Sequence, residues 1–512
     1  MKSFERVKSI HGKDYLYKVT PYYDKQSKKI RQKSEYMCPV KDGKPVEKSV
    51  ETYSYGEFIP VMKAVRDLKL DKVLEKIAGE YSQLILVMAM NGVIRPEAMD
   101  NIETWFEDSY LSRIYDIPLS SSTLSRRMES IGRMNLNYLF LKEILHITGD
   151  THAMYYDLTS FSSQSREMEF LEYGYSRSDP DLPQVNVSLV ESTESEIPVF
   201  YDIYPGSIVD ITTVKNTVDT LISAGINGIT LIMDRGMFSS SNIDYLIGNK
   251  IDFIMPASFT LKDVKKVATD ARKTIERGKN MAMVSGDIVF AENKTINTGN
   301  NNVNAWICYD PKRDRSERIS FYSSLHGRIE RLKSRKLNKW ENPYNVVNDI
   351  MSSYRSYISW KYSSGFNIKV KENAVSQRVN RCGITVITYT GEYDATTILE
   401  RYRKRDSVEK LFLSSKSFLG AEPLRVHSME TLRGVLFLNL VSLAIRSTIL
   451  KYMRQSKLIE KYSIEKMFLE LHKIRKVVLE NKEITTEITR KQKEILESFG
   501  IKPEHVPTFM KS

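Results

Sequence analysis

Residues 402–416, YRKRDSVEKLFLSSK, form the most informative stretch of the chain. The stretch contains no proline or glycine, so we expect it to be helical. On a helix that turns about 100° per residue, four polar side chains fall within an arc of about 60°. These four are Tyr402, Arg405, Glu409 and Lys416. Apolar residues flank the arc, so part of this face should pack inward and hold the polar groups in a cleft suited to phosphates.

Two upstream aspartates follow apolar stretches that resemble buried strands. Asp157 lies in Ala153–Thr159 (AMYYDLT), where we expect it to end a strand, and Asp234 ends Ile229–Asp234 (ITLIMD). A single aspartate in such a position is usually a helix cap or a turn former. Two of them at the ends of adjacent core strands indicate a site.

The elements around these aspartates predict an α/β fold. Strands are expected at 153–159, 185–190 and 198–204, a helix at 211–224 and a buried parallel strand at 229–234. Three strands, a helix and a parallel strand form the first half of a ribonuclease-H-like core. We therefore expect a ribonuclease-H-like catalytic core.

The spacing Tyr-(2)-Arg-(3)-Glu-(6)-Lys in residues 402–416 resembles the signature of the YREK group of DD-E transposases, which bacterial and archaeal insertion sequences encode. Residues 157–159 (DLT) resemble that family's Asp-x-Thr, and residues 234–238 (DRGMF) its Asp-x-Gly-x-aromatic motif. Residues 204–207 (YPGS) also have a counterpart there. Asp406 is a departure, because the family often has an aromatic residue after the arginine. The resemblance implies a transposase that cuts the ends of an insertion sequence and joins the 3′-OH ends to target DNA.

The resemblance implies that Asp157, Asp234 and Glu409 are the catalytic and metal-binding residues. Three carboxylates in one cleft repel one another unless cations neutralise them, and hard oxygen ligands suit Mg²⁺ or Mn²⁺. Two such ions about 3.5–4 Å apart can support in-line phosphoryl transfer. We therefore expect two divalent ions in each active site.

The other three residues of the arc are expected to bind DNA. Arg405 can form a bidentate contact with a phosphate, and Lys416 supplies a point charge. Tyr402 can donate to a phosphate or stack on a base. The alternative for Arg405 is a helix ion pair with Glu409 at i, i+4.

Six segments are expected along the chain. A helical DNA-binding region and an interrupted catalytic core should follow an N-terminal basic arm. The insertion in that core should be β-rich, with strands at 284–290, 306–309, 319–322, 367–371 and 384–390. The C-terminal part should include an amphipathic helix from Ile464 to Val478. The segments are a β-meander at 1–56, the helical region at 57–150, core halves at 151–259 and 393–455, the insertion at 260–392, and a C-terminal helical region at 456–512.

Two further features have two interpretations each. The capped helix expected at 118–128 places Arg126 and Arg127 near its start, as a DNA recognition helix or many surface helices would. Trp306, Trp340 and Trp360 could stack on an unpaired base, although burial in a core is favoured for each.

Composition favours a polyanionic partner inside the cell. The net charge is +12 and the pI about 9.2, which favours nucleic acid. Three separated cysteines and the absence of HExxH argue against a disulfide framework or a zinc enzyme. The start of the chain lacks a signal-peptide pattern, and the longest apolar run, Val435–Ile445, is shorter than the roughly 20 residues that span a bilayer. We expect a cytoplasmic, nucleoid-associated protein with no membrane or small-molecule partner.

Joining two DNA ends requires two active sites, so a homodimer on DNA is expected. Two other functions remain open. One is a DNA-binding protein derived from a transposase that no longer cuts, although the intact acidic triad argues against it. The other is a different ribonuclease-H-like nuclease, such as a resolvase or a nuclease for RNA hybrids.

Overall fold

The computed structural model divides the chain into two compact units, which are described separately. Unit 1 comprises Met1–Lys63, Met99–Ser120 and Tyr452–Ser512, and unit 2 comprises Ala64–Ala98 and Ser121–Lys451. The structure describes all residues except 1–2, 11–12, 25–28, 42–43, 46–49, 151, 166–167, 175–181, 209, 227, 339, 406–423, 425, 480–481 and 503–512.

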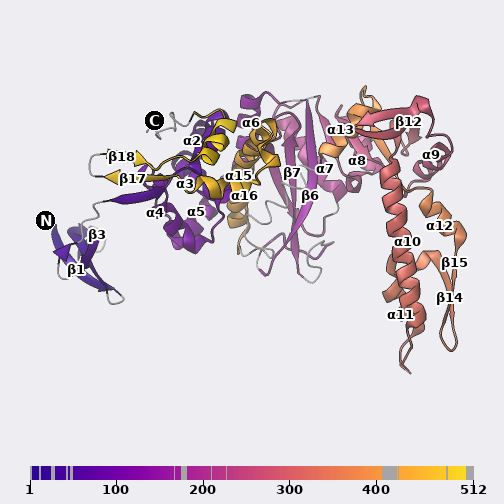
Figure 1. The fold of residues 1–512 in the computed structure, drawn as a ribbon, viewed down its shortest axis with the longest axis horizontal. Coiled ribbons are helices and arrows are strands. Elements are labelled where there is room, and N and C mark those ends of the chain that lie inside the picture. Colours follow the sequence, from indigo (N-terminus) through magenta and orange to yellow (C-terminus); the bar gives the residue numbers. More distant parts are fainter. Residues whose placement is uncertain are drawn as a thin grey trace. The chain divides into compact units, whose positions relative to one another are not determined.

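A nine-stranded mixed sheet forms the framework of unit 2 (Figure 1). Its strand order is β11-β12-β13-β16-β10-β9-β6-β7-β8. β6, β9 and β10 are parallel, whereas β7 runs antiparallel to both β6 and β8. This sheet confirms the α/β class. The strands are β6 Ala153–Ser162, β7 Gln184–Ser192, β8 Pro198–Pro205, β9 Thr230–Met233, β10 Asp252–Pro256, β11 Met281–Val284, β12 Asp287–Asn297, β13 Asn302–Tyr309 and β16 Ile384–Tyr389.

Two strands of the sheet, β7 and β9, are buried on both faces. Every residue of β7 and of β9 is buried, which is the pattern of strands covered on both sides. β6 is joined to α7 because the hydroxyl of Tyr156 donates to Thr213 Oγ1 at 2.7 Å. Helices of this unit include α2 Leu70–Ala78, α3 Ser82–Ile94, α5 Ser121–Arg133, α6 Leu136–Thr148, α7 Asp210–Ser223, α8 Ser240–Gly248 and α9 Lys262–Arg272.

Two helical stretches, Leu70–Ile94 and Met429–Gln455, are long and apolar enough to cross a membrane. The second is the helix α15, which contains the apolar run Val435–Ile445. Within unit 2 the hydroxyl of Ser442 on α15 donates to the carbonyl of Ala89 on α3 at 3.1 Å. The most apolar windows of the two stretches are 67% and 78% buried inside the protein, which is typical of core helices.

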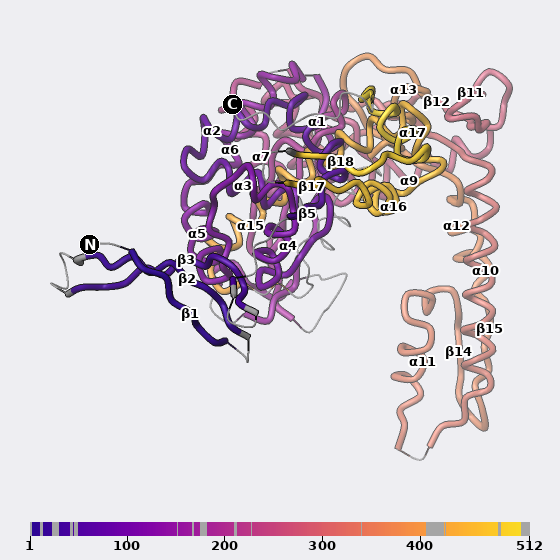
Figure 2. The backbone as a smooth tube through the Cα atoms, turned by 60° about the vertical axis from the view of Figure 1, so that its left-hand side comes forward, coloured from indigo at the N-terminus to yellow at the C-terminus, as the bar shows by residue number. Residues whose placement is uncertain are grey.

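Residues 311–381 form a helix–hairpin module of unit 2, which contains α10 Pro311–Ser334, α11 Pro343–Met351, β14 Ile358–Tyr362, β15 Phe366–Val370 and α12 Glu372–Val379. Figures 1 and 2 show α11 and the β14–β15 hairpin alongside α10. The strand expected at Ile319–Tyr322 is wrong, because these residues lie within α10. Phe321, Leu325 and Ile329 are buried and recur every fourth residue, which is a helical pattern. The four residues 319–322 are too few to show this pattern.

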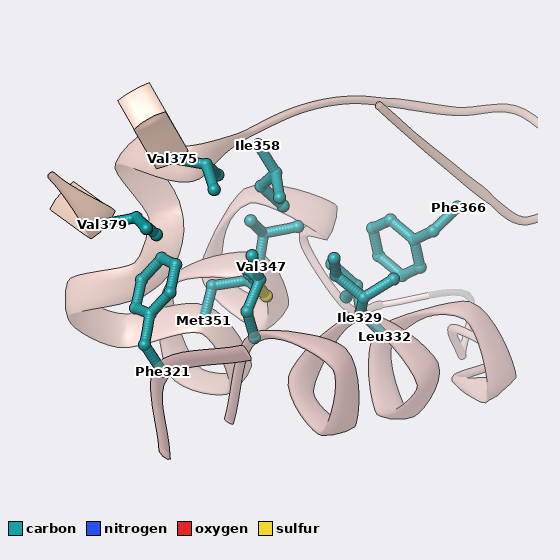
Figure 3. Packing of buried hydrophobic residues seen from close by; sticks show 10 residues of the cluster. Phe321, Ile329, Leu332, Val347, Met351, Ile358, Phe366, Val375 and Val379 are labelled. Carbon is teal, nitrogen blue, oxygen red and sulfur yellow. The ribbon is translucent and has the colours of Figure 1, made fainter. Parts of the chain in front are cut away.

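The module has its own apolar core (Figure 3). One face of α10 packs against α11, the hairpin and α12. The expected β-rich insertion is therefore helical to a large extent, while β11, β12, β13 and β16 extend the central sheet. The buried core residues are Phe321, Leu325, Ile329, Leu332, Val347, Met351, Ile358, Phe366, Val375 and Val379.

Unit 1 contains two small antiparallel sheets. The first, β1 Phe4–Ile10, β2 Lys13–Asp24, β3 Lys29–Lys41 and β4 Lys44–Pro45, lies where a β-meander was expected. In the second, β17 pairs with both β5 and β18. Its strands are β5 Glu51–Ser54, β17 Arg475–Leu479 and β18 Lys482–Thr485, and the helices are α1 Phe58–Asp67, which continues into unit 2, α4 Ile102–Asp108, α16 Ile464–Leu471 and α17 Arg490–Ser498.

The helix expected from Ile464 to Val478 is partly wrong. α16 ends at Leu471, and Val478 lies in β17 opposite Glu51. β17 pairs with β5, which lies about 420 positions earlier in the sequence. A local apolar period cannot reveal such a distant partner.

Candidate active site

Asp157 and Asp234 are neighbours at the point where β9 ends. The parallel register pairs Tyr155 with Ile232 and Tyr156 with Met233, so the two aspartates come next on adjacent strands. Asp157 does not end its strand as expected, because β6 continues to Ser162 and Asp157 pairs with Leu189 of β7. The site therefore forms where β6 loses its partner on one side.

Arg405 brings a positive charge to both aspartates. Its Nη1 lies 3.6 Å from Asp157 Oδ1, and its Nη2 lies 3.7 Å from Asp234 Oδ1. Arg405 is 6% exposed and Asp157 is 9% exposed, so water screens these charges weakly. The guanidinium thus offsets the repulsion between two carboxylates. The sequence suggested a phosphate or Glu409 as the partner of Arg405, and it missed this role.

Tyr402 completes the described part of the cluster. The guanidinium carbon of Arg405 lies 5.6 Å from the centre of the Tyr402 ring. Burial raises the pKa of the Tyr402 hydroxyl; the Arg405 charge lowers it, and the negative charge of Asp234 raises it further. Tyr402 therefore keeps its proton at neutral pH and can donate a hydrogen bond.

The helix α13, Ala395–Lys404, positions Tyr402 and Arg405. Asp394 caps its start by accepting a hydrogen bond from the backbone N–H of Thr397 at 2.6 Å. Near its other end, Arg403 donates to Asp310 Oδ2 at 3.2 Å and to the carbonyl of Val284 at 3.1 Å. These contacts fix the end of α13 against β11 and the start of α10.

The two aspartates fit a divalent cation. Their oxygens are hard ligands, and the buried guanidinium between them shows that this position accepts positive charge. Within the described residues, no group of three or more His, Cys, Asp or Glu side chains could hold a metal ion. The expected third carboxylate, Glu409, lies outside the described residues, as do Lys416 and Asp406.

Arg126 and Arg127 lie on α5, apart from the elements that hold the carboxylates. Arg126 is exposed, and its Nε donates to the carbonyl of Ser122 at 3.2 Å, whereas Arg127 is half-buried. α5 packs closely on α15 through Gly132 and Gly434. A role of the two arginines in DNA binding stays a prediction.

The three tryptophans have different surroundings. Trp306 is half-buried, and its indole N–H donates to the carbonyl of Tyr393 at 3.1 Å. Trp360 is half-buried and packs against Phe366. Trp340 is 90% exposed, so the expectation of burial is wrong for this residue. It lies in the connection between α10 and α11, outside the buried core of the module.

Comparisons with known proteins assign the family. The model of the transposase DDE domain matches residues 153–445, which include Asp157, Asp234 and Arg405. No curated protein matches this chain. The chain is similar to a piggyBac transposase synaptic complex with hairpin DNA, at 10% identity and a TM-score of 0.36, over 82% of this chain and 79% of that one. It is also similar to a Drosophila P element transposase strand transfer complex, at 12% identity and a TM-score of 0.21, over 77% and 86% of the two chains. Because the family model spans more than half of the sequence, the chain belongs to the transposase DDE domain family.

Proposed function

We propose that this protein is a DD-E transposase of the YREK group that cuts DNA at the ends of an insertion sequence and joins the 3′-OH ends to target DNA. It would act on DNA in the cytoplasm. The observation behind this proposal is the cluster of Asp157, Asp234 and Arg405 at the end of β9, within the segment that matches the family.

We also propose a ribonuclease-H-like core. The order β6, β7, β8, α7, β9 repeats the expected sequence of three strands, a helix and a parallel strand. In this arrangement the two aspartates fall on neighbouring parallel strands. The assignment of Glu409 as the third acidic residue rests on its place in the Tyr-(2)-Arg-(3)-Glu-(6)-Lys motif.

Asp157, Asp234 and Glu409 would hold two Mg²⁺ or Mn²⁺ ions. When bound, such ions supply stabilisation for the attacking and leaving oxygens of an in-line displacement at phosphorus. The aspartates supply four carboxylate oxygens. Asp157 lies within β6 and Asp234 directly follows β9, so the sheet sets the ligand positions before DNA binds. No covalent protein intermediate is needed.

The remaining cluster residues would position DNA. Tyr402 keeps its proton and donates to a phosphate oxygen. Arg405 is shared between the aspartates in the absence of other cations, and a bound DNA phosphate would give its guanidinium a second set of acceptors. Lys416 and the α5 residues Arg126 and Arg127 would add contacts to the DNA backbone. Because two ends must be joined, the active form would be a homodimer on DNA.

A cleavage assay tests the proposal. The purified full-length protein is incubated with Mg²⁺ and a labelled duplex that bears the inverted repeat flanking its gene. We expect cleavage at the repeat end and a joined product, both lost in Asp234→Asn. Asp71→Asn, an exposed residue of α2, is the matched control and should behave as the unmodified protein.

The outcomes distinguish the alternatives. Specific binding without any cutting would favour a transposase-derived DNA-binding protein. Cutting without joining, or a preference for RNA hybrids, would favour another nuclease. Full-rate cleavage by Asp234→Asn would refute the site assignment.

A further inference from the structure

The helix–hairpin module, residues 311–381, contains most of the protein's net charge. It has 16 Lys and Arg residues and 6 Asp and Glu residues, so its net charge is +10, compared with +12 for the whole chain. Positive and negative charges nearly cancel over the rest of the chain taken together. A compact element with such an excess attracts polyanions.

Six cations of the module are available for a partner. All six are exposed, and in the described part of the chain none of their side chains has a hydrogen-bond or ion-pair partner. Other module cations are already paired, as Arg318 is with Asp314 and Arg335 with Glu341. The six available residues are Arg315, Arg331, Lys336, Lys361, Lys369 and Lys371.

The β14–β15 hairpin presents three of these lysines on its outer face. Its register places Lys361 opposite Asn367 and Lys369 opposite Ser359, and all four residues are exposed. Lys371 continues the same face, because its backbone N–H bonds to the carbonyl of Tyr357 at 2.8 Å. The opposite face of the hairpin, which includes Ile358 and Phe366, packs in the module core (Figure 3). The lysines therefore line one side of a ribbon with a fixed inner face.

An exposed aromatic residue lies in the same module. Trp340 is 90% exposed, between α10 and α11, and Lys336 precedes it in the same connection. An indole beside cations is typical of surfaces that bind nucleic acids, because it can stack on a base or pack against a sugar.

The module is attached firmly to the catalytic part of unit 2. The backbone N–H of Asp310 donates to the carbonyl of Gly383 at 2.9 Å, which closes the base of the module. Asp310 also accepts from Arg403, two residues before Arg405. The module is thus a packed element held at its base by α13.

We propose that the outer face of the β14–β15 hairpin is a separate binding surface for duplex DNA, which contacts the phosphate backbone with Lys361, Lys369 and Lys371. DNA is the partner because exposed cations on the outer face of a packed hairpin complement a regular array of phosphates. The contact depends little on base sequence. It requires neither metal nor cleavage, so it holds or fails independently of the proposed reaction.

The test measures DNA binding in EDTA, where no cutting occurs. The full-length variant Lys361→Gln/Lys369→Gln/Lys371→Gln is compared with the unmodified protein by fluorescence anisotropy with a labelled random-sequence duplex. Each lost phosphate contact should reduce the slope of log K against log[salt] by about 0.9, so we expect a decrease of about 2.7. Affinity at about 0.1 M salt should fall tenfold or more.

The matched control is Lys72→Gln/Lys491→Gln/Lys493→Gln, which neutralises three exposed lysines outside the module. It should retain the slope and affinity within about twofold, and both variants should keep the melting temperature, because the substituted side chains are exposed. DNA should quench the intrinsic fluorescence of Trp340, and Trp340→Phe should remove that quenching. If the module variant binds DNA with unchanged affinity and slope, the proposal is overturned. It is also overturned if the variant loses binding only to anionic phosphatidylglycerol vesicles.

Discussion

Arg405 Nη1 lies 3.6 Å from Asp157 Oδ1, and the other terminal nitrogen of the same guanidinium lies 3.7 Å from Asp234 Oδ1. One buried cation therefore bridges two carboxylates that come from adjacent parallel strands. The arrangement stabilises the metal-free protein, because it offsets the repulsion that the aspartates would otherwise exert on one another. It also makes Arg405 a competitor of the cations that the site is proposed to bind.

Arg405→Gln should destabilise the metal-free protein. Removal of one partner from a buried ion pair costs about 3 kcal/mol, because the carboxylate of Asp157 stays buried without its cation. Mn²⁺ should restore much of the lost stability, since a divalent ion can replace the missing positive charge. Thermal unfolding with EDTA and with Mn²⁺ measures both effects.

Arg401→Gln is the matched control on the same helix, because Arg401 lies over the ring of Tyr393. Its melting temperature should respond to Mn²⁺ as that of the unmodified protein does. If Arg405→Gln melts at the same temperature as the unmodified protein in EDTA, the bridging role of Arg405 is wrong.

Gly434→Ala should destabilise unit 2 severely. A Cβ at Gly434 would lie 2.1 Å from the carbonyl oxygen of Met128, and one at Gly132 would lie 1.7 Å from that of Glu430. α5 and α15 would have to separate, and overpacking of this kind costs about 1–3 kcal/mol or more. Urea unfolding followed by circular dichroism measures the loss.

Gly327→Ala gives the opposite expectation on the exposed face of a helix. Nothing lies within 4 Å of a Cβ at Gly327, which is in α10. Alanine should stabilise this helix by about 1 kcal/mol, because it has the higher helix propensity. Equal effects of the two substitutions would show that α5 and α15 do not approach closely.

The stability of unit 1 should fall as pH rises through neutrality. The ring of His472 bonds to the buried carboxylate of Glu57, which raises the pKa of His472 above 6.5. A raised pKa means that the folded state holds the proton more tightly than the unfolded state does. The added stability is therefore complete below about pH 6.5 and is lost as pH rises through the folded-state pKa.

Melting curves between about pH 6 and pH 9 test this dependence. His472→Gln should flatten the pH dependence and leave a low, constant stability, since glutamine can bond to Glu57 without titrating. A pH dependence that is as steep in His472→Gln as in the unmodified protein would assign it to other groups.

The sequence predicted the elements that depend on local pattern. Apolar runs such as Thr230–Met233 indicated the strands that meet at the site. The helix expected over residues 402–416 is described only up to Arg405, because α13 includes Tyr402 and ends at Lys404, and residues 406–423 lie outside the described residues. The neighbourhood of Asp157 and Asp234 followed from the expected strand order. These features were accessible because burial on both faces of a sheet leaves a continuous apolar signal.

The remainder depends on partners that are distant along the chain. The apolar residues of β17 continue the helical pattern of α16, and only the pairing with β5 shows that they form a strand. The four residues Ile319–Tyr322 alone resemble a strand. Leu325 and Ile329 are needed to recognise the helical spacing of the buried residues. The bridge formed by Arg405 could not be predicted, because it requires the middle of β6 and the ends of β9 and α13 to meet in three dimensions.

Titration with Mn²⁺ in the absence of DNA tests most directly whether Asp157 and Asp234 form one cation site. Isothermal titration calorimetry would compare the unmodified protein with Asp157→Asn and Asp234→Asn. We predict that each substitution weakens Mn²⁺ binding by about tenfold or more, because each removes a charged oxygen ligand. If either variant binds Mn²⁺ as tightly as the unmodified protein does, the two carboxylates do not share a cation, and the proposed active site is contradicted.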